Sequence, residues 1–343
     1  MTHDTTHPSP RPGAPAAPAA PVRWGVLGTG AIAHRFMTGL RALPDAQVAA
    51  VGSRGAATAA EFARTWDIPR AHASYADLAA DPGVDVVYVA TPHSVHRDAA
   101  VLCLEAGRHV LCEKPLAVNA AQAEQMVQAA RGAGRFLMEA MWTRFAPAMV
   151  RVRELVAEGA IGEVRMVSAT IGGSVPYDPR SRLFDPALAG GALLDVGVYP
   201  VALAGEFLGE ITGVEARATP APTGVDAQVA VVLTGAGGAL GLLGCSVQAH
   251  IPRRAAIVGT SGSIELADWY CPTGLVLHRA GAESEEMAFP HIANGFEYEA
   301  AEVQARLRAG ELESPLMSWD ESLRIARVLD EVRARVGVVY PGE

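Results

Sequence analysis

The chain has 343 residues, half of them hydrophobic, and its 37 acidic and 28 basic residues give a formal net charge of −9. This balance argues against nucleic acid, which needs a basic protein face, and against an acidic membrane surface as partner. The length exceeds what one hydrophobic core usually supports, so we expect two domains. The four cysteines form no CxxC pair and lie at no zinc-finger spacing from histidine, which favours reduced thiols in a cytoplasmic protein.

Two segments of unusual composition need separate interpretations. Residues 1–21 are rich in Pro, Ala and Thr and lack the basic and apolar regions of a signal peptide, so we expect a disordered tail. Residues 227–252 contain no charged side chain, but glycines at 235, 237 and 238 divide them. They predict two strands joined by a turn rather than a membrane-spanning helix.

From residue 22 to residue 140 short apolar strands alternate with helical segments. This rhythm predicts an α/β Rossmann domain, a doubly wound parallel sheet with right-handed crossovers. The predicted strands are Arg23–Gly28, Val48–Gly52, Val84–Ala90, His109–Cys112 and Phe136–Met138, and the predicted helices are Ala31–Leu43, Ala56–Trp66, Val95–Ala106 and Ala120–Ala133.

After residue 141 the rhythm changes to β-rich segments joined by Gly, Pro or Asp turns. Residues 141–318 therefore predict an α+β domain with an open, mostly antiparallel sheet, and residues 319–343 a final helix. The predicted strands are Val164–Ile171, Gly213–Ala218, Gln228–Leu233, Leu240–Val247, Ala255–Val258, Ser263–Leu266 and Gly274–His278, and the helices are Ala148–Glu158, Gly191–Leu208, Asn294–Arg308 and Trp319–Val336.

A glycine-rich motif, Gly28-Thr29-Gly30-Ala31-Ile32-Ala33, joins the first strand to the first helix. Gly28 allows a tight turn, Gly30 lets the backbone approach a pyrophosphate, and the helix N-terminus supplies positive charge. This G-x-G-x-x-A pattern, in its strand–helix context, predicts a dinucleotide site.

The end of the second strand predicts which dinucleotide is preferred. Sites for NAD place a carboxylate there, whereas this chain has Ser53 and Arg54. A hydroxyl and a guanidinium suit a 2′-phosphate, so we expect a preference for NADP(H), with NAD(H) as a second cofactor. The alternative is that Arg54 is an ordinary surface arginine.

Two further motifs lie at the carboxyl edge of the predicted sheet, where open α/β sheets bind ligands. Thr91-Pro92-His93 follows one strand, and we expect His93 to line the cofactor or substrate site unless it is a polar cap. Glu113-Lys114-Pro115 ends the next strand. A lysine desolvated beside a nicotinamide cation can exchange protons, although this tripeptide alone would also suit a surface loop.

These motifs, followed by a Gly-Gly-x3-Asp-x3-Tyr segment at 190–199, resemble the glucose–fructose oxidoreductase/inositol dehydrogenase (GFO/IDH/MocA) family over residues 22–340. The resemblance implies that Lys114 contributes to catalysis, that Pro115 is cis, and that the final helix returns to the first domain. Many members have His where this chain has Tyr199. The tyrosine and the segment 139–145 are more similar to the branch of dihydrodiol dehydrogenases and NADP-dependent D-xylose dehydrogenases.

The same resemblance suggests a catalytic set. Asp195 and Tyr199 are four apart and would share one face of a helix. Lys114 and Tyr199 would polarise a substrate oxygen and exchange its proton, and Asp195 would orient them, with ordinary helix packing as the alternative. Trp142 and Arg144, at the domain junction, would either wall a small polar substrate or pack the hinge, and Arg165 and Arg182 are weaker candidates.

The function implied is an NADP(H)-dependent oxidoreductase that moves a hydride between nicotinamide and a hydroxyl or carbonyl carbon of a sugar or cyclic diol. No metal is needed, because the hydride chemistry belongs to the cofactor. Two alternatives stay open: a reductase of a ketose or anhydrosugar with the same site, and a nucleotide-binding regulator without turnover. The uncharged strands of residues 227–252 predict a homodimer, or a dimer of dimers, through the second sheet.

Overall fold

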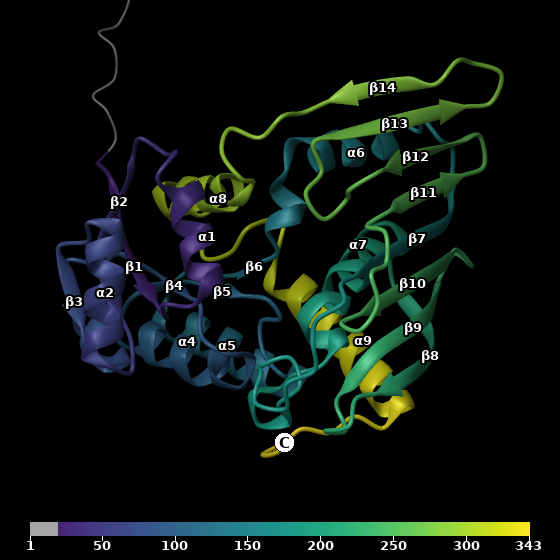
Figure 1. Cartoon of the computed structure of the whole chain (residues 1–343). Coiled ribbons are helices and arrows are strands. Elements are labelled where there is room, and N and C mark those ends of the chain that lie inside the picture. Colours follow the sequence, from purple (N-terminus) through teal and green to yellow (C-terminus); the bar gives the residue numbers. More distant parts are fainter. Residues whose placement is uncertain (1–19) are drawn as a thin grey trace, which may run out of the picture.

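The computed structural model describes residues 20–343, in which two β-sheets lie side by side and helices cover them (Figure 1). Residues 1–19, which hold most of the expected tail, lie outside the described residues. The first sheet has six parallel strands in the order β3-β2-β1-β4-β5-β6. This is the strand order of the dinucleotide-binding doubly wound fold, so the predicted Rossmann fold is confirmed.

Helices cover both faces of the first sheet, as the apolar sequence of its central strand β4 leads one to expect. All four residues of β4 are buried. The elements are β1 (Val22–Leu27), α1 (Ala31–Leu40), β2 (Ala46–Gly52), α2 (Ala56–Trp66), β3 (Arg70–His72), α3 (Tyr75–Ala80), β4 (Val86–Val89), a 3₁₀ turn (His93–Val95), α4 (His96–Glu105), β5 (His109–Glu113), α5 (Ala120–Ala133) and β6 (Leu137–Ala140).

The second sheet has eight strands in the order β14-β13-β12-β11-β7-β10-β9-β8. Only β7 and β10 pair in parallel, so the mostly antiparallel sheet is also confirmed. Its elements, with the helices around it, are a 3₁₀ turn (Trp142–Phe145), α6 (Pro147–Ala157), β7 (Val164–Gly172), a 3₁₀ turn (Pro186–Leu188), a π-turn (Leu193–Gly197), α7 (Val198–Leu208), β8 (Ile211–Pro220), β9 (Asp226–Gly235), β10 (Leu240–Ser246), β11 (Ala255–Gly259), β12 (Gly262–Leu266), β13 (Gly274–Arg279), β14 (Glu285–Ala288), α8 (Phe296–Ala309) and α9 (Trp319–Val336).

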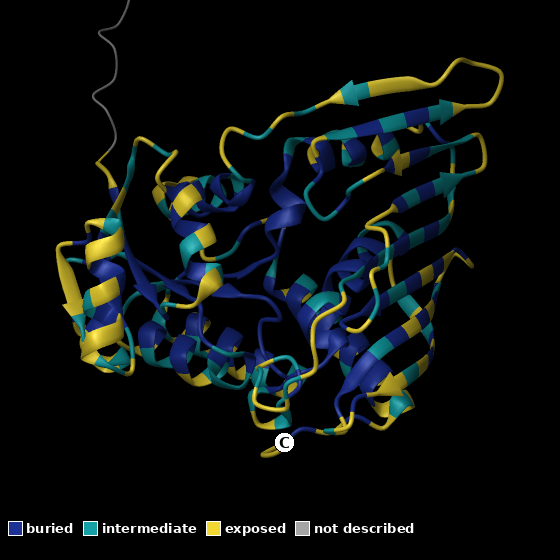
Figure 2. Cartoon of the chain, viewed as in Figure 1, coloured by how far each residue is buried: buried dark blue, intermediate teal, exposed yellow. Residues whose placement is uncertain are grey.

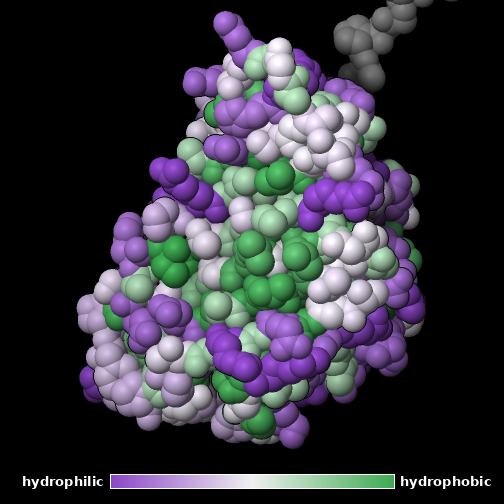
Figure 3. All heavy atoms as spheres, turned by 90° about the vertical axis from the view of Figure 1, so that its right-hand side faces the viewer, coloured by the Kyte–Doolittle hydropathy of each residue, from purple (hydrophilic) through white to green (hydrophobic). Residues whose placement is uncertain are grey.

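One face of the second sheet packs on α7 and the other is open (Figure 2). Residues alternate between buried and exposed along β9, as expected for a sheet with one covered face. Val232, Leu240 and Leu242 point to the open side, with 39%, 37% and 41% of their surface exposed. The surface view shows a hydrophobic patch at the centre of this face (Figure 3).

Several predicted elements differ from the observed ones. The expected helix 191–208 begins with a π-turn, and only Val198–Leu208 is α-helical. The strands β3 and β14 and the helix α3 were not predicted, because they are short and carry no clear hydrophobic period. The segment Pro186–Leu208 is long and apolar enough to cross a membrane. However, 78% of the 18-residue apolar stretch within it is buried inside the protein, as in the core helix of a folded protein.

The last two helices connect the two sheets. Helix α8, which the expected boundaries put in the second domain, packs against α1, and its Gln304 Oε1 accepts a hydrogen bond of 3.3 Å from Trp24 Nε1. Helix α9 packs on α5 of the first part and on α7 and β8 of the second. Trp319 Nε1, at the start of α9, donates to the carbonyl of Leu137 in β6 at 2.9 Å.

Candidate active site

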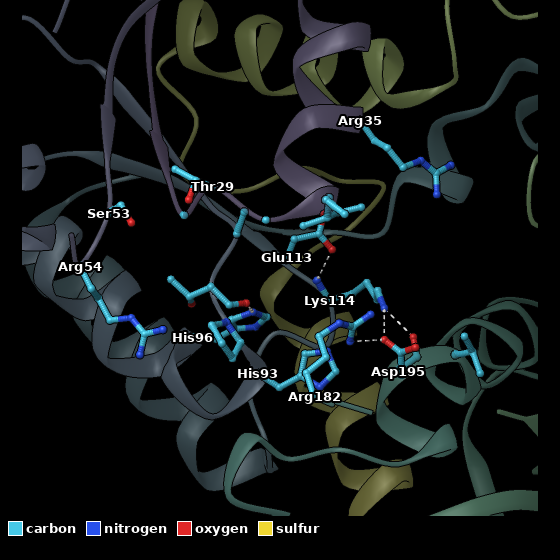
Figure 4. A pocket seen from close by; sticks show the side chains of 18 of the residues that line it. Thr29, Arg35, Ser53, Arg54, His93, His96, Glu113, Lys114, Arg182 and Asp195 are labelled. Carbon is cyan, nitrogen blue, oxygen red and sulfur yellow. Dashed lines mark hydrogen bonds and ion pairs between the residues drawn. The ribbon is translucent and has the colours of Figure 1, made fainter. Parts of the chain in front are cut away.

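A cavity of about 480 Å³ lies at the carboxyl edge of the first sheet, where the π-turn of the second part faces it (Figure 4). It brings together most of the residues that the sequence singled out. Its walls include Gly28, Thr29, Gly30, Ala31, Ile32, Ser53, Arg54, Thr91, Pro92, His93, Glu113, Lys114, Asp195 and Tyr199.

The glycine-rich loop at one side of the cavity fits a dinucleotide pyrophosphate. Gly28 has φ of +107°, and a Cβ there would lie 2.5 Å from the carbonyl oxygen of Ala90, so only glycine fits. Around Gly30, by contrast, no atom lies within 4 Å of where a Cβ would be. The loop thus leaves open space directly before the N-terminus of α1, where an anion is stabilised by backbone N–H groups.

Ser53 and Arg54 lie at the adenosine end expected for such a cofactor, directly after β2. The Ser53 hydroxyl is 2.8 Å from the Thr58 hydroxyl. Arg54 is exposed and forms no ion pair within residues 20–343. Its guanidinium is therefore available to a ligand phosphate.

Two uncharged histidines, His93 and His96, line the cavity. His93 Nδ1 lies 3.1 Å from the carbonyl oxygen of Ala189, and burial, with Lys114 nearby, lowers the pKa of His93 to about 3. His96 lies between the carbonyl oxygens of Pro115 and Thr91, at 2.8 and 2.9 Å. Burial lowers the pKa of His96 to about 4, so both rings are neutral near pH 7.

Lys114 is presented by the end of β5 and is followed by a cis peptide bond to Pro115, which confirms that expectation. Lys114 Nζ donates to the carbonyl oxygen of Asp195 at 2.5 Å and lies 5.0 Å from the centre of the Tyr199 ring. The neighbouring Glu113 carboxylate accepts hydrogen bonds from Tyr88 OH and from the backbone N–H of Lys114. Burial raises the pKa of Glu113.

The carbonyl oxygen of Asp195 that accepts from Lys114 belongs to the π-turn. In the i+5 pattern of a π-helix the carbonyl of Asp195 would pair with the N–H of residue 200, which is proline and has none. The Asp195 carboxylate accepts a hydrogen bond of 2.8 Å from Arg182 and lies 3.7 Å from Lys114 Nζ. Although burial opposes it, these two cations lower the pKa of Asp195 to about 2.

Tyr199 is 3% exposed, and its hydroxyl accepts a hydrogen bond of 3.1 Å from Trp142 Nε1. Burial raises the pKa of Tyr199 well above its ordinary value, so the phenol keeps its proton. Trp142 itself is 1% exposed and stacks on Phe296 at 4.7 Å. It therefore supports Tyr199 from behind rather than lining the cavity.

The structure does not bring Trp142 or Arg144 to the cavity wall, and a direct substrate contact by either is not supported. Arg144 is 5% exposed, 2.6 Å from the Glu321 carboxylate and 3.6 Å from that of Glu206. These contacts tie the segment after β6 to α7 and α9. The hinge-packing alternative describes both residues.

The cavity wall also includes residues that the sequence reading missed or undervalued, among them Arg35, Arg182 and Tyr270. Arg35 lies three residues after Ile32 on α1, so helical spacing from the glycine motif could have found it. Tyr270 lies in a loop after β12 and carries no sequence signal. One stronger signal was overlooked, because Lys114 is the only lysine in the sequence and all other basic residues in its total of 28 are arginine.

Comparisons with known proteins agree with this arrangement. The model of an oxidoreductase family with an NAD-binding Rossmann fold, GFO/IDH/MocA, matches residues 22–141, and that of the GFO/IDH/MocA C-terminal domain matches residues 149–265. Trans-1,2-dihydrobenzene-1,2-diol dehydrogenase of Mus musculus is 40% identical over 336 residues, covering 93% of this chain and 98% of that protein.

Solved structures show the same likeness over the whole fold. Aldose-aldose oxidoreductase from Caulobacter crescentus matches with a TM-score of 0.84 at 26% identity, covering 92% of this chain and 98% of its own. KijD10, a 3-ketoreductase from Actinomadura kijaniata solved with NADP and TDP-benzene, matches with a TM-score of 0.81 at 29% identity and the same coverage. With its two domains matched in order, the chain belongs to the GFO/IDH/MocA family of NAD(P)-dependent oxidoreductases.

Proposed function

We propose that this protein uses NADP(H) to oxidise a hydroxyl carbon of a sugar or cyclic diol, with Lys114, Tyr199 and Asp195 as its catalytic residues. The observation that carries the proposal is their convergence. Lys114 comes from the first sheet and Asp195 and Tyr199 from the second part, yet all three line the cavity that begins at the glycine-rich loop. The diol class is supported by the diol dehydrogenase relatives, and the sugar class by the aldose oxidoreductase.

The roles follow from which groups hold a proton. The bound nicotinamide supplies the hydride chemistry. In oxidation the neutral amine of Lys114 takes the proton of the substrate hydroxyl, and in reduction the ammonium form returns it, since an amine can exchange a proton that a guanidinium cannot. Tyr199, whose phenol stays protonated, donates a hydrogen bond to the same oxygen. Asp195 holds Lys114 through its carbonyl and balances its charge through its carboxylate.

The preference for NADP(H) rests on the unpaired Arg54 guanidinium beside Ser53, with no carboxylate at the end of β2 to repel a 2′-phosphate. NADP in the related 3-ketoreductase structure is consistent with this choice. We also propose a cytoplasmic location, supported by four cysteines that are all free in the described residues.

The open face of the second sheet supports a homo-oligomer, a dimer or a dimer of dimers. Exposed apolar side chains on β9 and β10 form a continuous patch there, and such patches commonly mark protein–protein interfaces. The first sheet, which carries the cavity at its carboxyl edge, lies on the α7 side of the second sheet (Figure 1), so a partner on the open face leaves the site accessible.

Absorbance of the reduced nicotinamide tests the function directly. The protein is mixed with NADP⁺ and a panel of aldoses and trans-dihydrodiols, and separately with NADPH and ketoses or an anhydrosugar. Turnover in the first arm supports the proposal. Turnover confined to the second arm establishes the reductase alternative. Tight NADP⁺ binding without turnover in either arm supports the other alternative, a nucleotide-binding regulator.

A further inference from the structure

Arg35 is a cation of the cavity wall that has no role in the proposed mechanism. It lies on α1, and its guanidinium carbon is 5.3 Å from the centre of the Phe296 ring and 6.0 Å from that of Trp142. Within residues 20–343 its side chain has no ion pair and no hydrogen bond, although it lines the cavity. Stacking on aromatic faces holds a guanidinium in place and leaves its N–H edge free.

Arg35 lies at the substrate end rather than the adenosine end. Trp142, over which it is placed, donates to the hydroxyl of Tyr199, and Lys114 Nζ lies over the ring of the same Tyr199. The hydrogen-bonded Trp142–Tyr199 pair therefore links Arg35 to Lys114. Figure 4 shows Arg35 and Arg54 at opposite ends of the cavity, with Lys114 between them.

At the Arg35 end of the cavity the basic side chains are not matched by acidic ones among the described residues. The Asp195 carboxylate is shared by Lys114 and Arg182, at 3.7 and 2.8 Å. The only other acid of the cavity wall among the described residues, Glu113, is hydrogen-bonded to Tyr88 in the interior. Arg35, an exposed residue, therefore lines the cavity with no acidic partner on its wall among the described residues.

We propose that Arg35 binds an anionic group of the substrate, a carboxylate or a phosphate, at the end away from the reacting carbon. A guanidinium forms paired hydrogen bonds with either group. The substrate is then a sugar acid or a sugar phosphate rather than a neutral sugar, a narrowing that rests on the function proposed above.

The test compares D-glucose, D-glucuronate and D-glucose 6-phosphate, which share a ring and differ at one carbon. With saturating NADP⁺, kcat/KM of the wild type should be about 10- to 100-fold higher for one or both anions than for D-glucose, the range of a charged hydrogen bond. Arg35→Gln should remove most of that ratio, and Arg35→Lys should keep part of it. A preference for glucuronate indicates a carboxylate, and one for the phosphate ester a phosphate.

The matched control is Arg41→Gln. Arg41 follows the same helix and stacks on Trp66 at 5.6 Å, but it lies outside the cavity wall, so its substitution should leave every ratio unchanged. Calorimetric binding of the two anions to the protein–NADP⁺ complex needs no turnover, and it separates failure of this inference from failure of the proposed reaction. Three results would overturn the proposal. All three compounds bind equally, neither anion binds, or Arg35→Gln weakens the binding of NADP⁺ as much as that of the anion.

Discussion

Lys114 has a chemistry that no other basic residue of this chain can supply. Every other cation among its Lys and Arg residues is arginine, which does not release its proton in proteins. The one amine is nine-tenths buried at the end of β5, held by the carbonyl of Asp195. A composition so strongly biased to arginine that still keeps a lysine at this position favours a role in proton exchange over a role as a mere positive charge.

Replacing Lys114 by Met should therefore abolish turnover while cofactor affinity stays close to that of the wild type. Removal of a general acid or base typically lowers the rate by ~10²- to 10⁴-fold. Lys114→Arg is the sharper variant, because it keeps the charge and removes the proton exchange, and we expect it to be as inactive. Stopped-flow rates and the dissociation constant of NADP⁺ check both variants, and wild-type kcat in either one would refute the mechanism.

The single lysine also allows a direct measurement. Protein labelled with ¹⁵N-lysine should give one Nζ signal in NMR spectra, and its titration reports Lys114 alone. Tyr199→Phe serves as the companion variant, since it deletes only the hydroxyl that accepts from Trp142. It should lower kcat less than Lys114→Met does, and a silent Tyr199→Phe would leave Lys114 as the only acid–base residue.

Arg54 should decide between the two cofactors. A charged hydrogen bond to the 2′-phosphate corresponds to about 10- to 150-fold in affinity, so Arg54→Ala should weaken NADP(H) by that factor and barely change NAD(H). Ser53→Asp should reverse the preference, because it adds a repelling charge and a ribose acceptor. Fluorescence titration of both cofactors checks this, with Arg64→Ala on α2 as the control. Equal losses for both cofactors would mean that Arg54 is only a surface residue.

At the scale of elements, the π-turn before α7 depends on one buried carboxyl group. Asp226, at the start of β9, is fully buried, and its Oδ2 accepts a hydrogen bond of 2.6 Å from the N–H of Leu193. Gly191 makes this approach possible, because a Cβ there would lie 2.3 Å from the other oxygen of Asp226. Asp226 thus fixes the beginning of the turn that positions Asp195.

Burial raises the pKa of Asp226 to about 7, which predicts how stability changes with pH. The folded-state pKa lies above the ordinary value of 3.8, so the neutral carboxyl favours the folded state at low pH, and this contribution is lost as the pH rises through about 7. Between pH 5 and pH 8 the loss should amount to about 2–3 kcal/mol, since one pKa unit is worth about 1.4 kcal/mol.

Asp226→Asn should remove that loss, because the amide carries no charge and can still accept from Leu193. The variant should be no more stable than the wild type at pH 5 and more stable at pH 8, as measured by urea unfolding at both values. Asp226→Ala, which has no acceptor, should be less stable at pH 5 and lower kcat as well. A stability difference between Asp226→Asn and wild type that is the same at both pH values would refute the titration.

How far these elements could be predicted from the sequence depends on how many residues carry the signal. The buried run around Val86–Val89 and the glycine motif have long or specific patterns, and the structure has them as expected. A π-turn of five residues cannot be distinguished from an α-helix by periodicity. Trp142 and Arg144 were correctly located at the junction, but sequence position does not reveal which side of a junction a side chain faces.

At the scale of the whole molecule, the site forms only where the first sheet meets the second part of the chain, and these two parts have different sequence patterns. The strand order of the first sheet brings the ends of β1, β4 and β5 to one edge, and this much follows from the alternating pattern. Helices α8 and α9 pack across the junction, and they hold the π-turn of the second half opposite this edge. No local pattern encodes such long-range packing, so the contact between Lys114 and Asp195 was expected only from the family resemblance.

The open face of the second sheet yields the last prediction, a homodimer. Leu242 on β10 is 41% exposed and lies opposite Val232 on β9, in the centre of an apolar face that nothing in the described chain covers. Leu242→Glu should be tolerated in a monomer, because the side chain is partly exposed, but in a dimer it buries an unpaired charge. Light scattering at micromolar concentration should therefore give twice the chain mass of 35.8 kDa for the wild type and a single chain mass for Leu242→Glu. Val339→Glu is the matched control, since Val339 is 76% exposed beyond the end of α9 and should leave the dimer intact. A monomeric wild type would rule out the interface, and a dimeric Leu242→Glu variant would place it elsewhere on the surface.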